Sequence, residues 1–464
     1  MAYKKVMAAA FAVTLFLAGC AGSTDKGTSP AAVPLKETMN PISVRQLVAA
    51  DNEHNRTIMF QLLKSVEAFV EYREKGNDRI FSVSAKGAAL KGNNGITDSY
   101  IYTAELTDLK KGTAYEYRTR TGNTVSGWMD FRTDDGGAFK AVIYPDSQSA
   151  DYTGWSKLAT KAYELNKDAA LFISMGDLVD NGQDEYQWQA WMRSMKGIMD
   201  TIPGAVMMGN HEDYSLDWKM AKPDRYLAHF HLPNNGDADY KDHFYSFDWG
   251  DVHFTVLDTQ LNELKEWYPD LFEREKKWAA DDLARTDKKW KVVLMHKDPL
   301  QYAFAGREGR EEGFSPEGQE FMPVFDASHV DLVLSAHLHT YRDRGRIYDF
   351  RRAETGPYYI ITGVAGDVRY PGLWKAHSLD IYFAPQPETD NYLVMEAGED
   401  ALVVTGYTSD GQEMHKSVIR KYYMVYKWLI NPIGNNRSFL NKPESITGKY
   451  RCFIESGEEC EKIF

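Results

Sequence analysis

Apolar and polar residues alternate in the first part of this chain. Between residues 42 and 133, short runs with this alternation are separated by turn residues, which is typical of antiparallel strands. The predicted strands are Thr57–Leu62, Ala68–Tyr72, Ile80–Ser84, Tyr100–Leu106, Tyr115–Thr119 and Trp128–Arg132. Strands at this spacing predict an all-β sandwich domain over residues 42–134.

A different pattern begins after the turn-rich segment at residues 133–137. Short continuous apolar runs alternate there with stretches that have the period of amphipathic helices. The predicted strands are Phe139–Tyr144, Ala170–Met175, Ala205–Met208, Lys291–Met295 and Asp331–Ser335, with a hairpin over His243–Asp258 and further strand at Tyr358–Val364 and Tyr392–Thr408. The predicted helices are Trp155–Asn166, Tyr186–Met199, Glu273–Arg285 and Pro316–Ala327. This alternation predicts an α/β domain of mixed sheets, an αββα sandwich, over residues 138–421.

The first twenty residues have the features of a targeting segment. Lys4 and Lys5 precede an apolar stretch, Val6–Phe16, which is too short to span a bilayer. Residues 17–20, Leu-Ala-Gly-Cys, resemble a bacterial lipobox, which predicts a lipid on Cys20 and a flexible tether over residues 21–41. We therefore expect an extracytoplasmic lipoprotein held on a membrane, in the periplasm or at the cell surface; the alternative is an ordinary signal peptide with a chance cysteine.

The end of the chain, residues 422–464, lies beyond the predicted α/β domain. The run Tyr422–Ile430 is too apolar to be left in water, so we expect it to pack on a domain. Cys452 and Cys460 are either a disulfide, as an extracytoplasmic protein would allow, or two free thiols.

The net charge of the chain argues against one class of binding partner. The chain has a net charge of -13, which argues against a nucleic acid bound through its phosphates. A small phosphate ester remains compatible with this charge, because bound metal ions reverse its sign locally. Nothing in the sequence indicates an obligate protein partner.

Polar residues follow the apolar runs of the second stretch at five places. These clusters are Asp146–Gln148, Gly176–Asp180, Gly209–Glu212, Met295–His296 and His337–His339. Sites in open α/β sheets form beyond the carboxyl ends of the strands, where these clusters lie. Carboxylate, amide oxygen and imidazole are ligands of Mn, Fe and Zn. A single buried histidine is more often structural, but the five clusters together predict a metal site.

In their order and composition the five clusters resemble the calcineurin-like metallophosphoesterase superfamily, which includes the purple acid phosphatases. The resemblance covers roughly Phe139–Lys421. Residues 109–117 also resemble the tyrosine corner of fibronectin type III domains, and a module of that kind precedes the catalytic domain in purple acid phosphatases. The resemblance implies two metal ions (Mn, Fe or Zn) bridged by Asp177. It implies these further ligands: Asp146 and His339 for one ion, and Asn210, His296 and His337 for the other.

The resemblance also implies a mechanism. A metal-bound hydroxide attacks phosphorus, and His211 faces the substrate and assists departure of the alkoxide. The alternative for His211 is a residue that only holds the geometry of the site. The expected function is hydrolysis of phosphate esters, monoesters foremost, with a phosphodiesterase or nucleotidase as the alternative.

Two positions depart from the family pattern. Gln148 stands where the common pattern has a histidine, and its amide oxygen is a weaker ligand than imidazole. Asp180 stands where purple acid phosphatases have the tyrosine that gives them their colour. Asp180 either orients a ligand or belongs to a turn. Gln148 is also the one feature that favours a surface-binding lipoprotein whose site has lost its activity.

Four residues near the clusters are candidates for contact with substrate. Tyr341 and Arg342 follow the last histidine pair, and Arg307 and Arg310 lie in a glycine-containing loop after His296. Each is either a rim residue that meets the phosphate ester or an ordinary solvated side chain. The sequence does not decide between the two.

Overall fold

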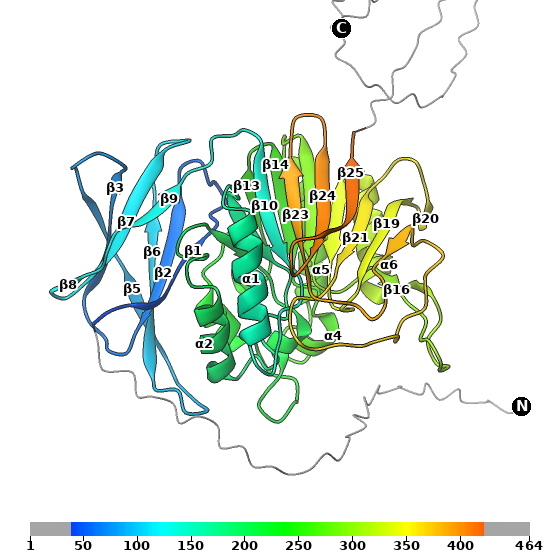
Figure 1. Cartoon of the computed structure of the whole chain (residues 1–464), viewed down its shortest axis with the longest axis horizontal. Helices are drawn as coiled ribbons and strands as arrows, with labels where there is room; N and C mark the ends of the chain where they lie inside the picture. Colours follow the sequence, from blue (N-terminus) through cyan, green and yellow to red (C-terminus); the bar gives the residue numbers. More distant parts are fainter. Residues whose placement is uncertain (1–38, 422–464) are drawn as a thin grey trace, which may run out of the picture. The chain divides into compact units, whose positions relative to one another are not determined.

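The computed structural model describes residues 39–421 (Figure 1). Cys20, Cys452 and Cys460 lie outside the described residues, as do the targeting segment and the apolar run after Lys421. The predictions made for them therefore stay predictions. Among the described helices, none is long and apolar enough to cross a membrane.

The N-terminal part is all β, as predicted. Its strands are β1 (Ile42–Leu47), β2 (Arg56–Leu62), β3 (Ala68–Glu74), β4 (Phe81–Ser84), β5 (Lys86–Leu90), β6 (Ser99–Leu106), β7 (Ala114–Thr121), β8 (Thr124–Val125) and β9 (Met129–Arg132). One layer has the order β1-β2-β6-β5, and the other has β4-β3-β7-β8 with β9 beside β7. The inward side chains form one apolar core, which includes Ile58, Phe60 and Val70. The hydroxyl of Tyr115 accepts a hydrogen bond of 2.8 Å from the backbone N–H of Lys110, the contact that defines a tyrosine corner.

The second part contains two mixed sheets. The first sheet contains β10 (Phe139–Tyr144), β11 (Leu171–Ser174), β12 (Gly204–Val206), β23 (Asn391–Ala397), β24 (Leu402–Thr408) and β25 (Glu413–Ile419). The second contains β13 (Tyr245–Trp249), β14 (Val252–Leu257), β15 (Trp290–Met295), β18 (Leu332–Ser335), β19 (Tyr341–Tyr348), β20 (Arg351–Arg352), β21 (Tyr358–Thr362) and β22 (Tyr382–Phe383). Two short strands, β16 (Leu300–Gln301) and β17 (Gly313–Phe314), pair with each other.

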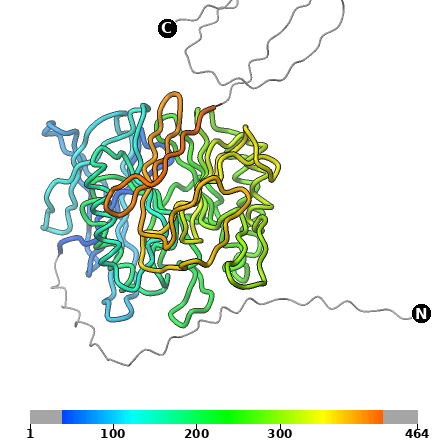
Figure 2. The backbone as a smooth tube through the Cα atoms, turned by 45° about the vertical axis from the view of Figure 1, so that its right-hand side comes forward, coloured from blue at the N-terminus to red at the C-terminus, as the bar shows by residue number. Residues whose placement is uncertain are grey.

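Helices cover the sheets on their outer sides. They are α1 (Thr153–Leu165), α2 (Glu185–Ser194), α3 (Asp224–His229), α4 (Leu261–Leu264), α5 (Leu271–Arg285) and α6 (Pro316–Ala327), with single 3-10 turns at Asn210–Asp213 and Ala238–Tyr240. Helices α1 and α2 contact each other and the first sheet, and α5 contacts α6 and β14 of the second sheet. Figure 2 shows the course of the same backbone as a tube, turned by 45° from the view of Figure 1. The predicted αββα class is therefore confirmed.

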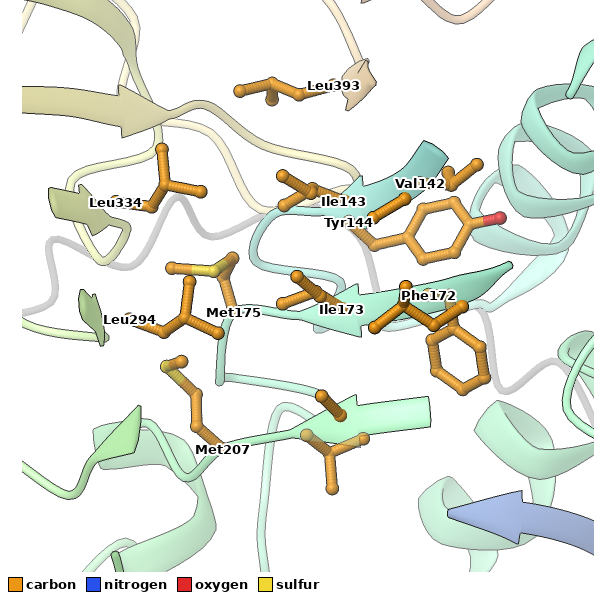
Figure 3. Packing of buried hydrophobic residues seen from close by; sticks show 14 of the residues in the cluster. Val142, Ile143, Tyr144, Phe172, Ile173, Met175, Met207, Leu294, Leu334 and Leu393 are labelled. Atoms are coloured by element: carbon orange, nitrogen blue, oxygen red, sulfur yellow. The ribbon is translucent and has the colours of Figure 1, made fainter. Parts of the chain in front are cut away.

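The core lies between the two sheets and also under the helices. In Figure 3, Ile143 and Ile173 point toward Leu294 of the second sheet, whereas Val142 and Phe172 point to the opposite face. All five side chains are buried. Strands β10 and β11 are thus buried on both faces, which is why they appear in the sequence as continuous apolar runs rather than as an alternation.

One strand joins the two parts of the molecule. The strand β1 pairs in parallel with β12 at Leu47 and Gly204, so the first sheet runs on into the N-terminal layer as a single ten-stranded sheet. The side chain of Arg45 donates to the carbonyl oxygen of His229 at 2.6 and 2.9 Å and adds a second tie. The sequence pattern did not predict β1. The continuous sheet fixes the N-terminal layer against the α/β layers through backbone hydrogen bonds.

Several elements end earlier than their patterns predict. Helix α2 ends at Ser194 rather than at Met199, and Gly197 follows with a φ of 86°, a left-handed conformation that cannot continue a helix. Strand β12 ends at Val206 because the chain leaves the sheet there toward Asn210. Strands β5 and β25 were not predicted, since their exposed faces carry small or polar residues instead of an apolar alternation.

Candidate metal centre

The five polar clusters meet at one edge of the paired sheets. Asp146, Asp177 and Asn210 follow β10, β11 and β12 of the first sheet, and His296 and His337 follow β15 and β18 of the second. Because all five strands end toward the same edge, residues from distant parts of the chain become neighbours.

Among the described residues, two groups of side chains have the geometry to hold a metal ion. One contains Asp146, Asp177 and His339, and the other contains Asp177, His296 and His337. Within each group the ligand atoms lie within 4.8 Å of one another. We call the first group with Gln148 the Asp146 half, and the second with Asn210 the His296 half. Asp177 belongs to both halves, as a bridging carboxylate must.

The backbone at these ligands is unusual. Asp177, His337 and His339 have φ values of 47°, 71° and 51°, in the left-handed region that residues other than glycine seldom adopt. Such conformations concentrate at functional sites, where the surrounding structure holds them. Gly209 also has a steric role, since a Cβ there would lie 2.1 Å from Oδ1 of Asp177. The close approach of the two loops thus requires glycine.

Two of the histidines are fixed by backbone carbonyls. Nδ1 of His296 donates to the carbonyl of Met175 and Nδ1 of His339 donates to that of Val368, both at 2.9 Å. These bonds set the tautomer and leave Nε2 of each ring as the ligand atom. Nε2 of His296 lies 3.2 Å from Oδ2 of Asp177, and Nε2 of His339 lies 3.8 Å from Oδ1 of Asp146.

The buried charges shift one another's pKa values. Burial raises the pKa of Asp146 to about 8, in spite of the nearby His296. Burial alone would lower the pKa of His296, but the charges of Asp177 and Asp146 and the hydrogen bonds to the ring together outweigh burial and raise that pKa to about 9. Burial lowers the pKa of His339 to about 4. His296 and Asp177 therefore form an ion pair in the metal-free protein, and a metal has to displace the proton.

The donor set fits a pair of divalent metal ions. Three imidazoles, two buried carboxylates and the amide of Asn210, whose Oδ1 lies 3.3 Å from Nε2 of His296, converge on one place. Among residues 39–421, the buried Nδ1 of His337 has no hydrogen-bond partner, which a metal ligand at this position would explain. The Asp146 half would hold one ion and the His296 half the other.

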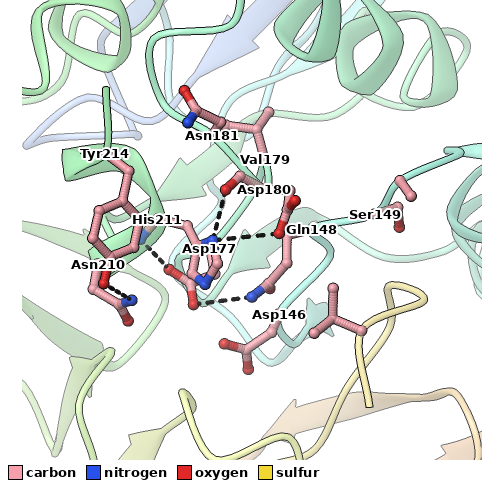
Figure 4. Close-up of polar contacts among 12 residues, drawn as sticks. Asp146, Gln148, Ser149, Asp177, Val179, Asp180, Asn181, Asn210, His211 and Tyr214 are labelled. Atoms are coloured by element: carbon pink, nitrogen blue, oxygen red, sulfur yellow. Dashed lines mark hydrogen bonds and ion pairs between the residues drawn. The ribbon is translucent and has the colours of Figure 1, made fainter. Parts of the chain in front are cut away.

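Gln148 lies inside the Asp146 half (Figure 4). Its side chain is only 1% exposed, and Nε2 lies 3.3 Å from Oδ2 of Asp177 and 3.2 Å from Nε2 of His339. Its Oε1 is buried and has no hydrogen-bond partner in the described part of the chain. The amide thus occupies the place of the histidine that the common family pattern has here. A rotation of the amide by half a turn would point its oxygen at the ligands.

His211 lies next to both halves and belongs to neither. Its backbone N–H donates to Oδ1 of Asp177 at 2.8 Å, and its Nδ1 donates to the backbone carbonyl of Asp180 at 2.7 Å. The carboxylate of Asp180 lies 3.5 Å from the same nitrogen. Asp180 therefore holds His211 rather than a residue of either ligand group, and within residues 39–421 no hydrogen bond engages Nε2 of His211.

Sequence reasoning missed the role of Glu212. This carboxylate is completely buried and accepts hydrogen bonds from the backbone N–H groups of Asp177 (3.0 Å), Leu178 (2.9 Å), Val179 (3.3 Å) and Gly209 (2.7 Å). It thereby ties the loop after β11 to the loop after β12. The sequence did offer one signal for this role. Glu212 is an acidic residue inside the cluster Gly209–Glu212, and it has no part in the predicted ligand set.

The four candidate contact residues lie in different environments. Tyr341 is fully buried and its ring packs against Tyr382 and His415, so it faces the core. Arg342 is buried and paired with Asp380 at 2.7 Å.

Of these four residues, only Arg342 lines a cavity of about 190 Å³ that also has His339 in its wall. The guanidinium groups of Arg307 and Arg310 lie over the ring of Phe304, at 3.8 and 5.8 Å from its centre. The structure therefore places the two loop arginines on an aromatic ring, and within residues 39–421 neither forms a hydrogen bond or ion pair with a residue of the metal centre.

Comparisons with known proteins agree with this architecture. The family model described as calcineurin-like phosphoesterase matches residues 148–341, and the model described as purple acid phosphatase, N-terminal domain, matches residues 41–133. Purple acid phosphatase 23 of Arabidopsis thaliana is 27% identical over 216 residues, which is 44% of this chain and 42% of that protein. Purple acid phosphatase 15 of the same plant is 24% identical over 63% of this chain and 58% of that protein. The match thus spans about half the length of these two relatives.

Solved structures share the fold. A purple acid phosphatase from seeds of yellow lupin (Lupinus luteus) superimposes with a TM-score of 0.67, at 20% identity, over 82% of this chain and 74% of that chain. The structure of PhoD superimposes with a TM-score of 0.58, at 14% identity, over 82% of this chain and 89% of that chain. Residues 148–341 therefore belong to a calcineurin-like phosphoesterase domain, and residues 41–133 before them belong to a purple acid phosphatase N-terminal domain.

Proposed function

We propose that this chain hydrolyses phosphate esters, phosphomonoesters foremost, at a centre of two metal ions. One observation carries the proposal: the carboxylate of Asp177 belongs to both ligand groups and has two oxygens to offer. The phosphatase names of the relatives support the same reaction class. When bound, the ions would supply positive charge to the phosphate and lower the pKa of a bound water.

The residues around the ions have separate tasks. Asp146 and Asp177 provide the negative charge that retains the ions in a buried site. The hydrogen bond to Asp180 uses the proton on Nδ1 of His211, so the ring can give a proton to the leaving oxygen only from Nε2, when it carries its second proton. Glu212 keeps the loops of Asp177 and His211 at the distance this transfer needs.

The test uses the purified protein loaded separately with Mn, Fe or Zn. Release of p-nitrophenol from p-nitrophenyl phosphate and from bis(p-nitrophenyl) phosphate is measured for wild type and for Asp177→Ala. We expect a higher kcat/KM for the monoester and loss of both reactions in the variant. Release from the diester alone would favour the phosphodiesterase alternative. No release with any metal would favour the surface-binding lipoprotein without activity.

We also propose that the protein is attached to the bacterial cell envelope through Cys20. The positive start, the apolar stretch and the lipobox-like residues 17–20 support this location. Fractionation of cells that express Cys20→Ala tests it, with loss of membrane association as the expected result. A variant that still sediments with membranes would point to another anchor, such as the apolar run after Lys421.

A further inference from the structure

An exposed apolar loop lies beside the metal centre. Leu216, Trp218 and Met220 are 48%, 55% and 45% exposed, three large apolar side chains within five residues. Single exposed apolar residues are common on protein surfaces, but clusters of them mark binding sites. We call these three residues the apolar rim.

The loop is held in place by its own hydrogen bonds. Tyr214 and Met220 form a β-bridge, and the backbone N–H of Ser215 donates to the carbonyl of Lys219 at 2.7 Å. The side chain of Asn181 donates to the carbonyl of Ser215 at 2.6 Å and ties the loop to the segment after Asp180. Trp218 has a φ of 61°, in the left-handed region that residues other than glycine seldom adopt. These hydrogen bonds thus hold the loop in a conformation that exposes Trp218 to solvent.

The rim is in contact with His211. The rings of Tyr214 and Trp218 meet the imidazole of His211 edge to face, with centroids at 5.3 and 6.2 Å, and lie 5.9 Å from each other. Tyr214 also accepts a hydrogen bond of 3.4 Å from Asn210 of the His296 half. A group bonded to the oxygen that receives the proton of His211 would therefore be next to Trp218.

From this contact we infer that the apolar rim binds the organic part of the substrate. The site then favours phosphate monoesters of aromatic or bulky apolar alcohols over those of small polar alcohols. The inference rests on the proposed function and specifies its substrate class. An indole ring presents a large, rigid apolar face, which suits it to contact with another ring. The position of Trp218 beside His211 favours a substrate group as its occupant over a membrane surface.

The experiment compares kcat/KM for 2-naphthyl phosphate and for glycerol phosphate in wild type, Trp218→Ala and Trp218→Phe. We expect Trp218→Ala to lower the ratio of the two values about tenfold, mainly through the KM of the naphthyl ester, since one aromatic contact has about that effect on binding. Trp218→Phe should restore most of the preference. The matched control is Tyr348→Ala at the end of β19, an aromatic residue that is 51% exposed and lies outside both ligand groups. Its ratio should equal that of wild type.

The outcomes separate this inference from the proposed function. If both esters are hydrolysed and Trp218→Ala leaves their ratio unchanged, the inference is overturned and the function stands. If Trp218→Ala in that case also binds lipid vesicles less well than wild type, the apolar rim binds a membrane surface instead. If neither ester is hydrolysed, the proposed function fails. Calorimetric binding of phenylphosphonate and methylphosphonate to the metal-loaded protein then decides, because equal effects of Trp218→Ala on both ligands would overturn the inference.

Discussion

The Asp146 half and the His296 half share Asp177 but differ in their remaining donors. The His296 half adds two imidazoles and the amide of Asn210. The Asp146 half adds one carboxylate, one imidazole and the amide of Gln148. The His296 half is thus richer in nitrogen ligands.

The Asp146 half is not the more exposed of the two halves. Gln148 and His339 are at most 5% exposed, whereas His337 in the other half is only half-buried. The contrast therefore lies in ligand chemistry, because imidazole favours Zn and oxygen donors favour harder ions such as Mn. From this comparison we expect one shared carboxylate to join two sites of unequal affinity, with the Asp146 half as the weaker. The following experiments test that inequality.

The largest effect is expected for Asp177, the ligand that the two halves share. Asp177→Ala should remove both ions and lower turnover by more than roughly 10³-fold, since even one hydrogen-bond donor to the transition state is worth about 10²–10³. Metal analysis and turnover of the purified variant measure this. Asp151→Ala, which removes an exposed carboxylate five residues after Asp146, is the control. Two retained ions with near-normal turnover would rule out the bridge.

His211 belongs to neither half, so its removal should leave both ions in place. We expect His211→Ala to keep the metal content and to lose about 10²–10⁴-fold in kcat, the usual contribution of a positioned general acid. His231→Ala, which removes a histidine paired with Glu105, serves as control. Metal loss in His211→Ala would instead make this residue a ligand or a structural element.

Glu212 should affect the two halves equally. Glu212→Ala leaves four buried backbone N–H groups without an acceptor, and each costs about 1–3 kcal/mol. We expect the free energy of unfolding to fall by roughly 4 kcal/mol or more and the affinity for both ions to fall about 10–100-fold.

Urea unfolding and metal titration measure these two quantities for Glu212→Ala. Glu266→Ala, at an exposed position between α4 and α5, is the control. A loss confined to one ion would show that Glu212 supports only one loop, and unchanged values would remove its positioning role.

The smallest and most selective effect is expected at Gln148. Gln148→His should tighten only the ion of the Asp146 half, by about tenfold, the scale at which even outer ligand partners act, and should shift its preference from Mn or Fe(II) toward Zn. Competitive metal titration of wild type and variant measures this. Chelators should remove that ion first from wild type. Equal affinities of the two proteins for every metal would place Gln148 outside the coordination shell.

Much of this architecture could be predicted from local patterns. Strand β10 and helix α6 have the predicted bounds, and the polar clusters follow strands as expected. Each of these features depends on residues close together in the sequence, so the pattern records it directly. Strand β1 was missed because its role depends on Gly204, a residue more than a hundred positions away along the chain.

Position 180 makes a separate prediction about colour. Because Asp180 stands there instead of a tyrosine, we expect the protein loaded with iron to be without the purple colour.

The sequence by itself determined the donor types and their positions after apolar strands, because these depend on the side chains alone. Only the tertiary structure decided that Glu212 ties two loops, that Asp180 orients His211, and that the ring of Trp218 meets His211. It also decided that Tyr341 faces the core. These properties arise when loops from different strands approach at a few ångströms. That approach depends on how the sheets pack, and no local pattern of residues encodes it.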